Sequence, residues 1–253
     1  MRAYGKLCTE FYDLDKPAAP PDELAFYLAQ ARIAGGPVLE PMCGSGRFLI
    51  PIMEAGLDIE GTDLSPDMLE ACRANAAARG LKPVLHEQSL ETLAVSRTFS
   101  FAFICSGSFG LIPTEAGVRA SLARLHGALK PGARLMLEVE RLLPASGHGE
   151  AWTGDWGGRE VARADGGTIR INWHPRWDPA SGTVISTHRY VASKDGVLLA
   201  SETEEFIIRP HDPKVLTAQL AGAGFERVEF LKPHGSRPAQ ETDSDLVVSC
   251  VRR

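Results

Sequence analysis

The 253-residue sequence lacks an apolar run long enough to cross a membrane, and it lacks a positively charged N-terminal region followed by a hydrophobic block. We therefore expect a cytoplasmic protein with no membrane partner. It also lacks an excess of basic residues, since 27 Lys and Arg stand against 32 Asp and Glu, a formal net charge of −5. This balance offers no footprint for a nucleic-acid backbone, so we expect no nucleic-acid partner.

Cysteine is also scarce, and its five positions are scattered: Cys8, Cys43, Cys72, Cys105 and Cys250. No pair has C-x-x-C spacing, and an odd number without a regular framework argues against a disulfide scaffold. We predict buried free thiols and no metal site. With 44% hydrophobic and 23% charged residues the composition is that of an ordinary globular protein, and the length allows one or two domains.

The stretch from Val38 to Met53 is the feature around which the rest of the chain is organised. Val38 to Glu40 is predicted to end a buried strand, and Arg47 to Ala55 to form a helix with one apolar face. Between them, Gly44 and Gly46 leave a turn without side chains. A glycine turn at a helix N-terminus presents backbone N–H groups to a ligand, so we predict a binding site here.

The acids around this turn indicate which ligand binds. A dinucleotide fingerprint, G-x-G-x-x-G, needs a third glycine where Leu49 stands, which disfavours a pyrophosphate. Instead, Glu40 lies four positions before Gly44, and Asp63 ends the next apolar strand, Leu57 to Asp63. An acid ending the second strand of such a unit can accept hydrogen bonds from both ribose hydroxyls. The pattern therefore suits a nucleoside without phosphates.

These two stretches resemble the class I (Rossmann-like) methyltransferases, whose cofactor S-adenosylmethionine carries a diol at one end and an amino acid at the other. Glu40 to Gly46 matches their first motif, and Asp63 to Leu69 matches their second. The one departure is Met42, where the family usually has glycine. The resemblance implies an α/β fold with a doubly wound, mostly parallel seven-stranded sheet. Two alternatives stay open: a catalytically silent cofactor-binding module, and a nucleotide-linked oxidoreductase with a degenerate fingerprint.

The resemblance also implies a set of cofactor-binding residues. In related enzymes a Phe-Tyr-Asp segment like the one containing Tyr12 folds over the cofactor, and its ring offers a cation–π contact to the sulfonium. Arg47 would pair with the cofactor carboxylate. The family usually has an acid or amide at the position of Ser89, beside the adenine, with an apolar residue such as Leu90 against the ring; here Gln88 or backbone groups are alternatives. The full set is Tyr12, Glu40, Met42, Gly44, Gly46, Arg47, Asp63, Leu64, Met68, Ser89, Leu90 and Cys105.

A near-continuous apolar run from Thr98 to Ile104 predicts a central parallel strand. Ligands of open parallel sheets bind beyond the strand C-termini, so the loop that follows, Cys105 to Gly110, should face the reactive methyl group, with Ser108 and Phe109 near the acceptor. The Asp/Asn-Pro-Pro-Tyr signature of methyltransferases acting on DNA bases is absent, which removes that substrate class.

Residues 141–210 interrupt the α/β alternation. Period-two apolar runs at 168–173, 183–191 and 198–208 predict an antiparallel meander inserted after the fifth strand, with loops at 146–149 and 157–158. We therefore divide the chain into a cofactor-binding part (1–140), an inserted β subdomain covering the substrate (141–210) and a C-terminal part (211–253) that completes the sheet.

All four tryptophans lie between positions 152 and 177. We expect Trp152, Trp156 and Trp173 to help line an acceptor pocket, and the alternative is that they fill a core or a subunit interface. The insert and Tyr12 make the chain most like small-molecule N-methyltransferases of the glycine and amino-sugar kind. The expected partner is thus a small-molecule acceptor methylated on nitrogen rather than oxygen.

The sequence assigns no catalytic base. The candidates in or near the insert are His148, Glu150, His174 and His188. The oligomeric state is also left open between monomer and homodimer.

Overall fold

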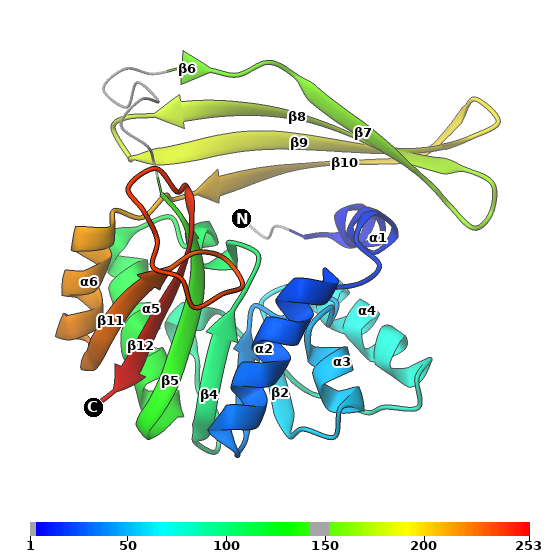
Figure 1. The fold of residues 1–253 in the computed structure, drawn as a ribbon. Helices are drawn as coiled ribbons and strands as arrows, with labels where there is room; N and C mark the ends of the chain where they lie inside the picture. Colours follow the sequence, from blue (N-terminus) through cyan, green and yellow to red (C-terminus); the bar gives the residue numbers. More distant parts are fainter. Residues whose placement is uncertain (1–3, 142–151) are drawn as a thin grey trace.

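The computed structural model describes residues 4–141 and 152–253, apart from the side chain of Trp152. An α/β body lies beneath a second, antiparallel sheet that arches over it (Figure 1). The seven strands of the body have the order β11-β12-β5-β4-β1-β2-β3. They are β1 (Val38–Pro41), β2 (Ile59–Asp63), β3 (Val84–Glu87), β4 (Phe99–Ile104), β5 (Leu129–Glu140), β11 (Phe225–Leu231) and β12 (Asp245–Arg252). β1 to β5 pair in parallel and β12 is antiparallel to both its neighbours, so the predicted mostly parallel seven-stranded sheet is confirmed.

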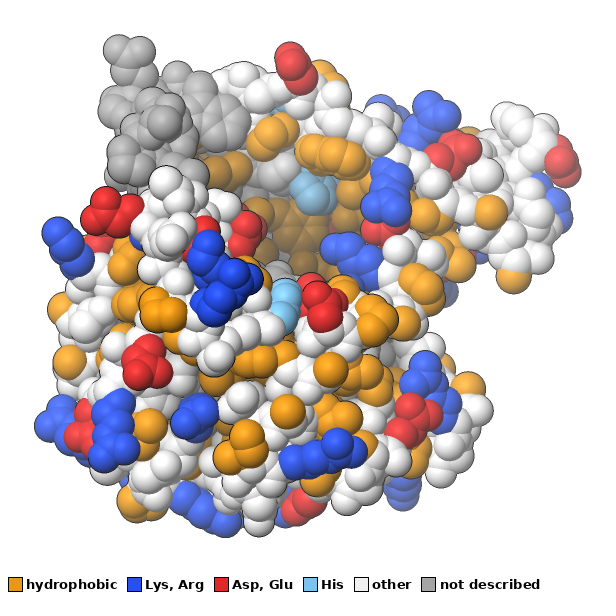
Figure 2. All heavy atoms as spheres, viewed as in Figure 1, with side chains coloured by type: hydrophobic (Ala, Val, Ile, Leu, Met, Phe, Trp, Pro, Cys, Tyr) orange, Lys and Arg blue, Asp and Glu red, His pale blue; other side chains and the backbone are white. Residues whose placement is uncertain are grey.

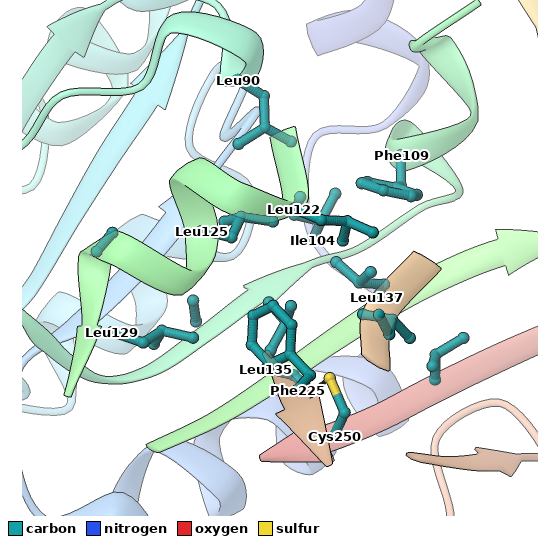
Figure 3. Packing of buried hydrophobic residues seen from close by; sticks show 14 of the residues in the cluster. Leu90, Ile104, Phe109, Leu122, Leu125, Leu129, Leu135, Leu137, Phe225 and Cys250 are labelled. Carbon is teal, nitrogen blue, oxygen red and sulfur yellow. Dashed lines mark hydrogen bonds between the residues drawn. The ribbon is translucent and has the colours of Figure 1, made fainter. Parts of the chain in front are cut away.

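Helices cover both faces of this sheet, as its nearly continuous burial requires. On one face, Leu122 and Leu125 of α5 pack against Leu135 and Leu137 of β5 (Figure 3). On the other face, α2, α3 and α4 bury a second cluster that includes Tyr27. The helices of the body are α2 (Pro21–Ala34), α3 (Leu49–Glu54), α4 (Pro66–Ala77), α5 (Glu115–Ala128) and α6 (Pro213–Gly222), with the 3₁₀ turns η1 (Leu90–Thr92) and η2 (Ser108–Leu111). Among the described residues, none of the helices combines the length and apolarity needed to span a membrane.

The second sheet is the inserted meander, and it confirms the prediction for the insert. Its strands are β6 (Trp152–Thr153), β7 (Gly157–Ala162), β8 (Thr168–Asp178), β9 (Thr183–Lys194) and β10 (Val197–Ile208). The order is β10-β9-β8-β6, with β7 also paired to β8, and all pairs are antiparallel. The prediction of a loop at Gly157-Gly158 is wrong, because both residues belong to β7. A Cβ on Gly157 would lie 2.1 Å from Trp173, so glycine is needed there to admit the indole ring across the strand pair.

The N-terminal segment forms a helix that the sequence did not predict, α1 (Lys6–Asp15). Its apolar face, with Leu7 and Phe11, packs against the second sheet. Glu204 of β10 accepts hydrogen bonds from the backbone N–H groups of Tyr4 (3.0 Å) and Gly5 (2.5 Å) at the start of the helix. A carboxylate at a helix N-terminus stabilises the helix, because its negative charge interacts favourably with the positive end of the helix dipole. Leu7, Cys8 and Phe11 recur at helical spacing, so the local pattern carried a helix signal that the sequence interpretation missed.

Candidate functional site

The glycine turn lies between β1 and α3, at the point where the strand order reverses. Gly44 and Gly46 have positive φ angles of 54° and 86°, and Met42 also has a positive φ of 59°. Glycine adopts this conformation readily, which gives a physical reason for the family's usual glycine at the position of Met42. The turn delays the helix, so α3 begins at Leu49, two residues later than predicted, and Arg47 lies in the turn.

A cavity of about 470 Å³ opens beside this turn, at the C-terminal ends of β1, β2 and β4. Figure 2 shows a hollow with hydrophobic atoms at its depth between the body and the upper sheet. Most predicted site residues line the cavity: Tyr12, Glu40, Met42, Gly44, Arg47, Asp63, Leu64, Met68, Ser89, Leu90, Cys105 and Ser108. Gly46 packs beneath the turn, where a Cβ would lie 2.6 Å from Cys72 Sγ. Phe109 is fully buried in the core and packs on His211, so it lies in the wall behind the site.

Other lining residues were missed by the sequence interpretation. They include Tyr4, Ser65, Glu91 and residues 205–207 of β10. Only the folding of the second sheet back over the body brings β10 to this side, so no local pattern could have identified residues 205–207. Ser65 and Glu91, in contrast, directly follow the predicted residues Leu64 and Leu90, and that adjacency could have identified them.

Glu40 is the next-to-last residue of β1 and is only 1% exposed. Its Oε1 lies 3.8 Å from Cys105 Sγ, and its Oε2 has no hydrogen-bond partner within the described structure. Burial raises the pKa of this carboxyl well above its ordinary value of 4.5. A buried carboxylate oxygen without a donor is costly, so the site is built for a ligand that brings a donor or a positive charge.

Asp63 ties the second strand to the glycine turn. Its Oδ2 accepts a hydrogen bond from Gly44 N and its Oδ1 accepts one from Ser65 N, both at 2.9 Å. Burial raises its pKa, and these backbone donors partly oppose the shift. A carboxylate oxygen can accept more than one hydrogen bond, so both oxygens of Asp63 retain capacity toward the cavity.

Tyr12 of α1 and Arg47 of the glycine turn together form one wall of the first cavity. The guanidinium carbon of Arg47 lies 5.7 Å from the centre of the Tyr12 ring and 5.3 Å from that of Phe48. An Arg47 NH2 group donates to Ser106 Oγ at 2.7 Å. Arg47 thus joins three parts of the chain, namely the turn after β1, the segment after β4 and helix α1.

A second cavity of about 350 Å³ lies between α1, the segment after β4 and the second sheet. It shares Tyr4, Tyr12, Ser106, Ser108 and Phe206 with the first cavity, so the two have a common wall. Of the predicted tryptophans, Trp173 lines it. Trp156 is 63% exposed, stacks on His174 with ring centres 4.6 Å apart and lines neither cavity, and the side chain of Trp152 is outside the described residues.

Two residues that line the second cavity, His188 and Glu140, have side chains that can gain or lose a proton. His188 Nε2 lies 2.9 Å from Ser186 Oγ, and burial lowers the pKa of this imidazole to about 4. Glu140, at the end of β5, has no hydrogen-bond or ion-pair partner for its carboxylate among the described residues, and desolvation with nearby Asp245 raises its pKa. Sequence reasoning missed Glu140, because the end of a strand carries no signal for a base. The candidates His148 and Glu150 lie outside the described residues.

Comparisons with known proteins agree with this geometry. Residues 38–132 match the family described as methyltransferase domain. The chain is 28% identical over 149 residues to a ubiquinone biosynthesis O-methyltransferase of Xanthomonas oryzae pv. oryzae, and the match covers 56% of this chain and 61% of that protein.

The fold is also similar to two solved structures. One is the sugar N-methyltransferase KedS8 from Streptoalloteichus sp. ATCC 53650, with 20% identity, a TM-score of 0.75 and coverage of 100% of this chain and 95% of that chain. The other is CalS10 with bound S-adenosylmethionine, an amino pentose methyltransferase from Micromonospora echinaspora, with 19% identity, a TM-score of 0.71 and coverage of 100% and 99%. Residues 38–132 thus match a methyltransferase domain, and the fold of the whole chain is the one that these two solved methyltransferases have.

Proposed function

We propose that the protein transfers a methyl group from S-adenosylmethionine to a small-molecule acceptor, and that the methylated atom is nitrogen rather than oxygen. The observation that carries this proposal is a pair of cavities with a common wall at Tyr12, Ser106 and Ser108. One cavity has two acids beside a glycine turn, and the other holds Glu140, whose carboxylate has no partner in the described part of the chain, beneath aromatic residues of the second sheet.

The first cavity fits the cofactor at both of its ends. Asp63 would accept hydrogen bonds from the ribose diol, and Leu64 and Leu90 would contact the adenine ring. The unpartnered Oε2 of Glu40 suits the ammonium of the methionine part, while Arg47 suits its carboxylate. Charge-assisted hydrogen bonds to ionised groups are about twice as strong as neutral ones, so this end would contribute strongly to affinity.

The second cavity would hold the acceptor. Glu140 would attract a cationic amine, and Trp173 offers an apolar face to the rest of the molecule. The names of KedS8 and CalS10, a sugar N-methyltransferase and an amino pentose methyltransferase, support nitrogen as the methylated atom. The similarity to a ubiquinone biosynthesis O-methyltransferase keeps oxygen as the second candidate.

When bound, S-adenosylmethionine supplies a methyl group on a positively charged sulfur. A lone pair of the acceptor attacks that methyl carbon in line with the carbon–sulfur bond, and the sulfur leaves as a neutral thioether. The protein contributes by aligning the acceptor and excluding water. An ammonium acceptor has no lone pair until it loses a proton, and the Glu140 carboxylate is the group we assign to accept that proton. Its raised pKa makes it a stronger base than an ordinary glutamate, whereas His188, with a pKa of about 4, is a weak one.

Calorimetric titration with S-adenosylmethionine, S-adenosylhomocysteine and NAD tests the cofactor. We expect the first two to bind and NAD not to bind; the reverse result would establish a nucleotide-linked oxidoreductase instead. Release of S-adenosylhomocysteine in the presence of matched pairs of small amines and alcohols then tests the reaction. Turnover of amines alone supports the proposal, turnover of alcohols alone assigns O-methylation, and binding without any turnover indicates a silent module.

Replacing Tyr12 should distinguish a contact with the sulfonium from simple packing. The Tyr12→Leu variant loses the π face, so its affinity for S-adenosylmethionine should fall by about 2- to 30-fold, the equivalent of ~0.5–2 kcal/mol. Its affinity for the uncharged thioether of S-adenosylhomocysteine should change less, and Tyr12→Phe should retain both affinities. An equal loss for the two ligands, measured by calorimetry, would leave Tyr12 as a packing residue only.

Two tryptophans on the second sheet form a matched pair for testing the acceptor cavity. Trp173→Phe removes part of the cavity wall, so kcat/KM for an amine found by screening should fall by about threefold to tenfold, the equivalent of ~0.5–1.5 kcal/mol. S-adenosylhomocysteine affinity should not change. Trp156→Phe, outside both cavities, should change neither quantity. If Trp156→Phe lowers kcat/KM and Trp173→Phe does not, the acceptor binds elsewhere.

A further inference from the structure

Three metal-ligating side chains from distant parts of the chain meet beside the cofactor site. They are Glu23 of α2, Glu138 of β5 and His234 in the segment between β11 and β12. One ligand atom from each lies within 4.8 Å of the other two. The side chains are 21%, 13% and 17% exposed, respectively, so all three are mostly buried. None of them lines either cavity described above.

The imidazole of His234 points between the two carboxylates. Its Nε2 lies 3.2 Å from Glu138 Oε1 and 3.7 Å from Glu23 Oε2. A single N–H can make a good hydrogen bond to only one of them, and 3.7 Å is too long for the second. Burial raises the pKa of Glu23, the charge of a protonated His234 lowers it, and Glu138 raises it. Two like charges thus share one imidazole, and a cation with more charge would neutralise both.

The spacing also fits a metal. Zinc binds imidazole nitrogen and carboxylate oxygen at about 2.0–2.2 Å, which places neighbouring ligand atoms of a tetrahedral site about 3.4 Å apart. The two measured separations from His234 lie on either side of that value. We propose that Glu23, Glu138 and His234 bind a divalent transition metal, Zn²⁺ by preference, with a fourth position left for water. One imidazole and two carboxylates favour Zn²⁺ or Mn²⁺ over Mg²⁺ and Ca²⁺, which prefer oxygen ligands alone.

The site is outside the cofactor cavity but is joined to it. Glu138 Oε2 accepts a hydrogen bond from Ser106 N at 2.5 Å, and Oε1 accepts one from the Tyr27 hydroxyl at 2.6 Å. Ser106 lines both cavities. The metal would therefore stabilise the segment after β4, with no part in the methyl transfer itself. The sequence predicted no metal site, because the three ligands have no local spacing that could reveal one.

The test is titration of the chelator-treated, dialysed protein with Zn²⁺ and Mn²⁺ alone, by calorimetry and by the Mn²⁺ electron paramagnetic resonance signal. We expect one Zn²⁺ per chain. Glu23→Gln and His234→Gln should each weaken binding by at least tenfold, about 1.4 kcal/mol. Both leave the contacts of Glu138 with Ser106 and Tyr27 in place, so the metal-free variants should keep the melting temperature of the wild type to within a few degrees.

His86 provides a matched control. Its Nε2 lies 2.8 Å from Glu60 Oε2, and Glu60 also pairs with Arg97. The His86–Glu60 pair therefore has an imidazole and one carboxylate, but it lacks the second carboxylate that the proposed metal site has. His86→Gln should leave Zn²⁺ affinity unchanged. The proposal is overturned if the wild type binds less than one Zn²⁺ per chain, or if Glu23→Gln and His86→Gln have the same effect. In either case Glu23, Glu138 and His234 form a structural cluster that does not bind a metal.

Discussion

Replacing Asp63 with alanine should weaken the binding of S-adenosylhomocysteine by at least tenfold while the protein remains folded. The carboxylate faces the first cavity and is anchored at 2.9 Å by the backbone of Gly44 and of Ser65. A hydrogen bond to a charged group contributes about 1.5–3 kcal/mol, and the loss of one such bond to the ribose already corresponds to a tenfold change or more.

The same substitution also removes the two backbone anchors, so part of the loss could come from the turn. A ligand without the ribose 2′-hydroxyl separates the two effects. Wild type should bind the 2′-deoxy analogue of S-adenosylhomocysteine more weakly than the parent compound, and Asp63→Ala should bind both equally. Asp67→Ala, in the first turn of α4 and outside the cavity, is the control and should bind like wild type. Unchanged affinity in a folded Asp63→Ala protein contradicts the assignment.

Glu40→Gln should make the ligand-free protein more stable and make it bind the cofactor more weakly. In the folded protein, burial raises the pKa of Glu40 well above 4.5, so the folded state binds more protons than the unfolded state. The free energy of unfolding therefore falls as the pH rises from about 4.5 toward the folded-state pKa. Glutamine carries no charge and avoids this cost, so its stabilising effect should be present at pH 8 and absent at pH 4.

Cofactor binding should change in the opposite direction, because a neutral amide replaces the carboxylate that faces the ammonium. We expect S-adenosylhomocysteine affinity to fall by at least tenfold in Glu40→Gln, about 1.4 kcal/mol or more. Thermal unfolding at pH 4, 6 and 8, with and without S-adenosylhomocysteine, measures both effects. Glu70→Gln, on the exposed face of α4 and outside both cavities, is the control and should show neither effect. A Glu40→Gln protein that binds as tightly as wild type would show that Glu40 serves only the packing of the turn.

Glu40→Gln is thus expected to raise the stability of the ligand-free protein and to lower its affinity for the cofactor. These opposite signs are expected of a residue that serves binding and not the stability of the empty protein. The unpaired Oε2 of Glu40 costs stability until a ligand supplies a partner. Asp63 differs, because two backbone donors already satisfy part of its capacity. Its replacement should therefore lower stability and affinity together.

The sequence by itself determined that the glycine turn and its two flanking acids lie together. Glu40, the two glycines and Asp63 fall within 25 positions of one another, on one strand–turn–helix–strand unit whose geometry follows from local conformation. The central strand β4 and the meander were likewise readable, because burial on both faces and on one face leave different apolar periods, whereas the order of the other parallel strands followed from the family resemblance. The exception within the strand–turn–helix–strand unit is the start of α3, since the positive φ of Gly46 delays the helix past Arg47.

Only the tertiary structure decided which residues line the second cavity and which meet at the proposed metal site. Helix α1 forms against the second sheet, β10 turns back to the cofactor side, and Glu140 reaches a cavity whose roof lies far away in sequence. Nothing in the sequence distinguishes Trp156 from Trp173 as a cavity residue. In the structure, Trp156 stacks on His174 at the surface and Trp173 lines the second cavity. Glu23, Glu138 and His234 meet for the same reason. Such contacts depend on how separate elements pack, and a local pattern of residues carries no information about that packing.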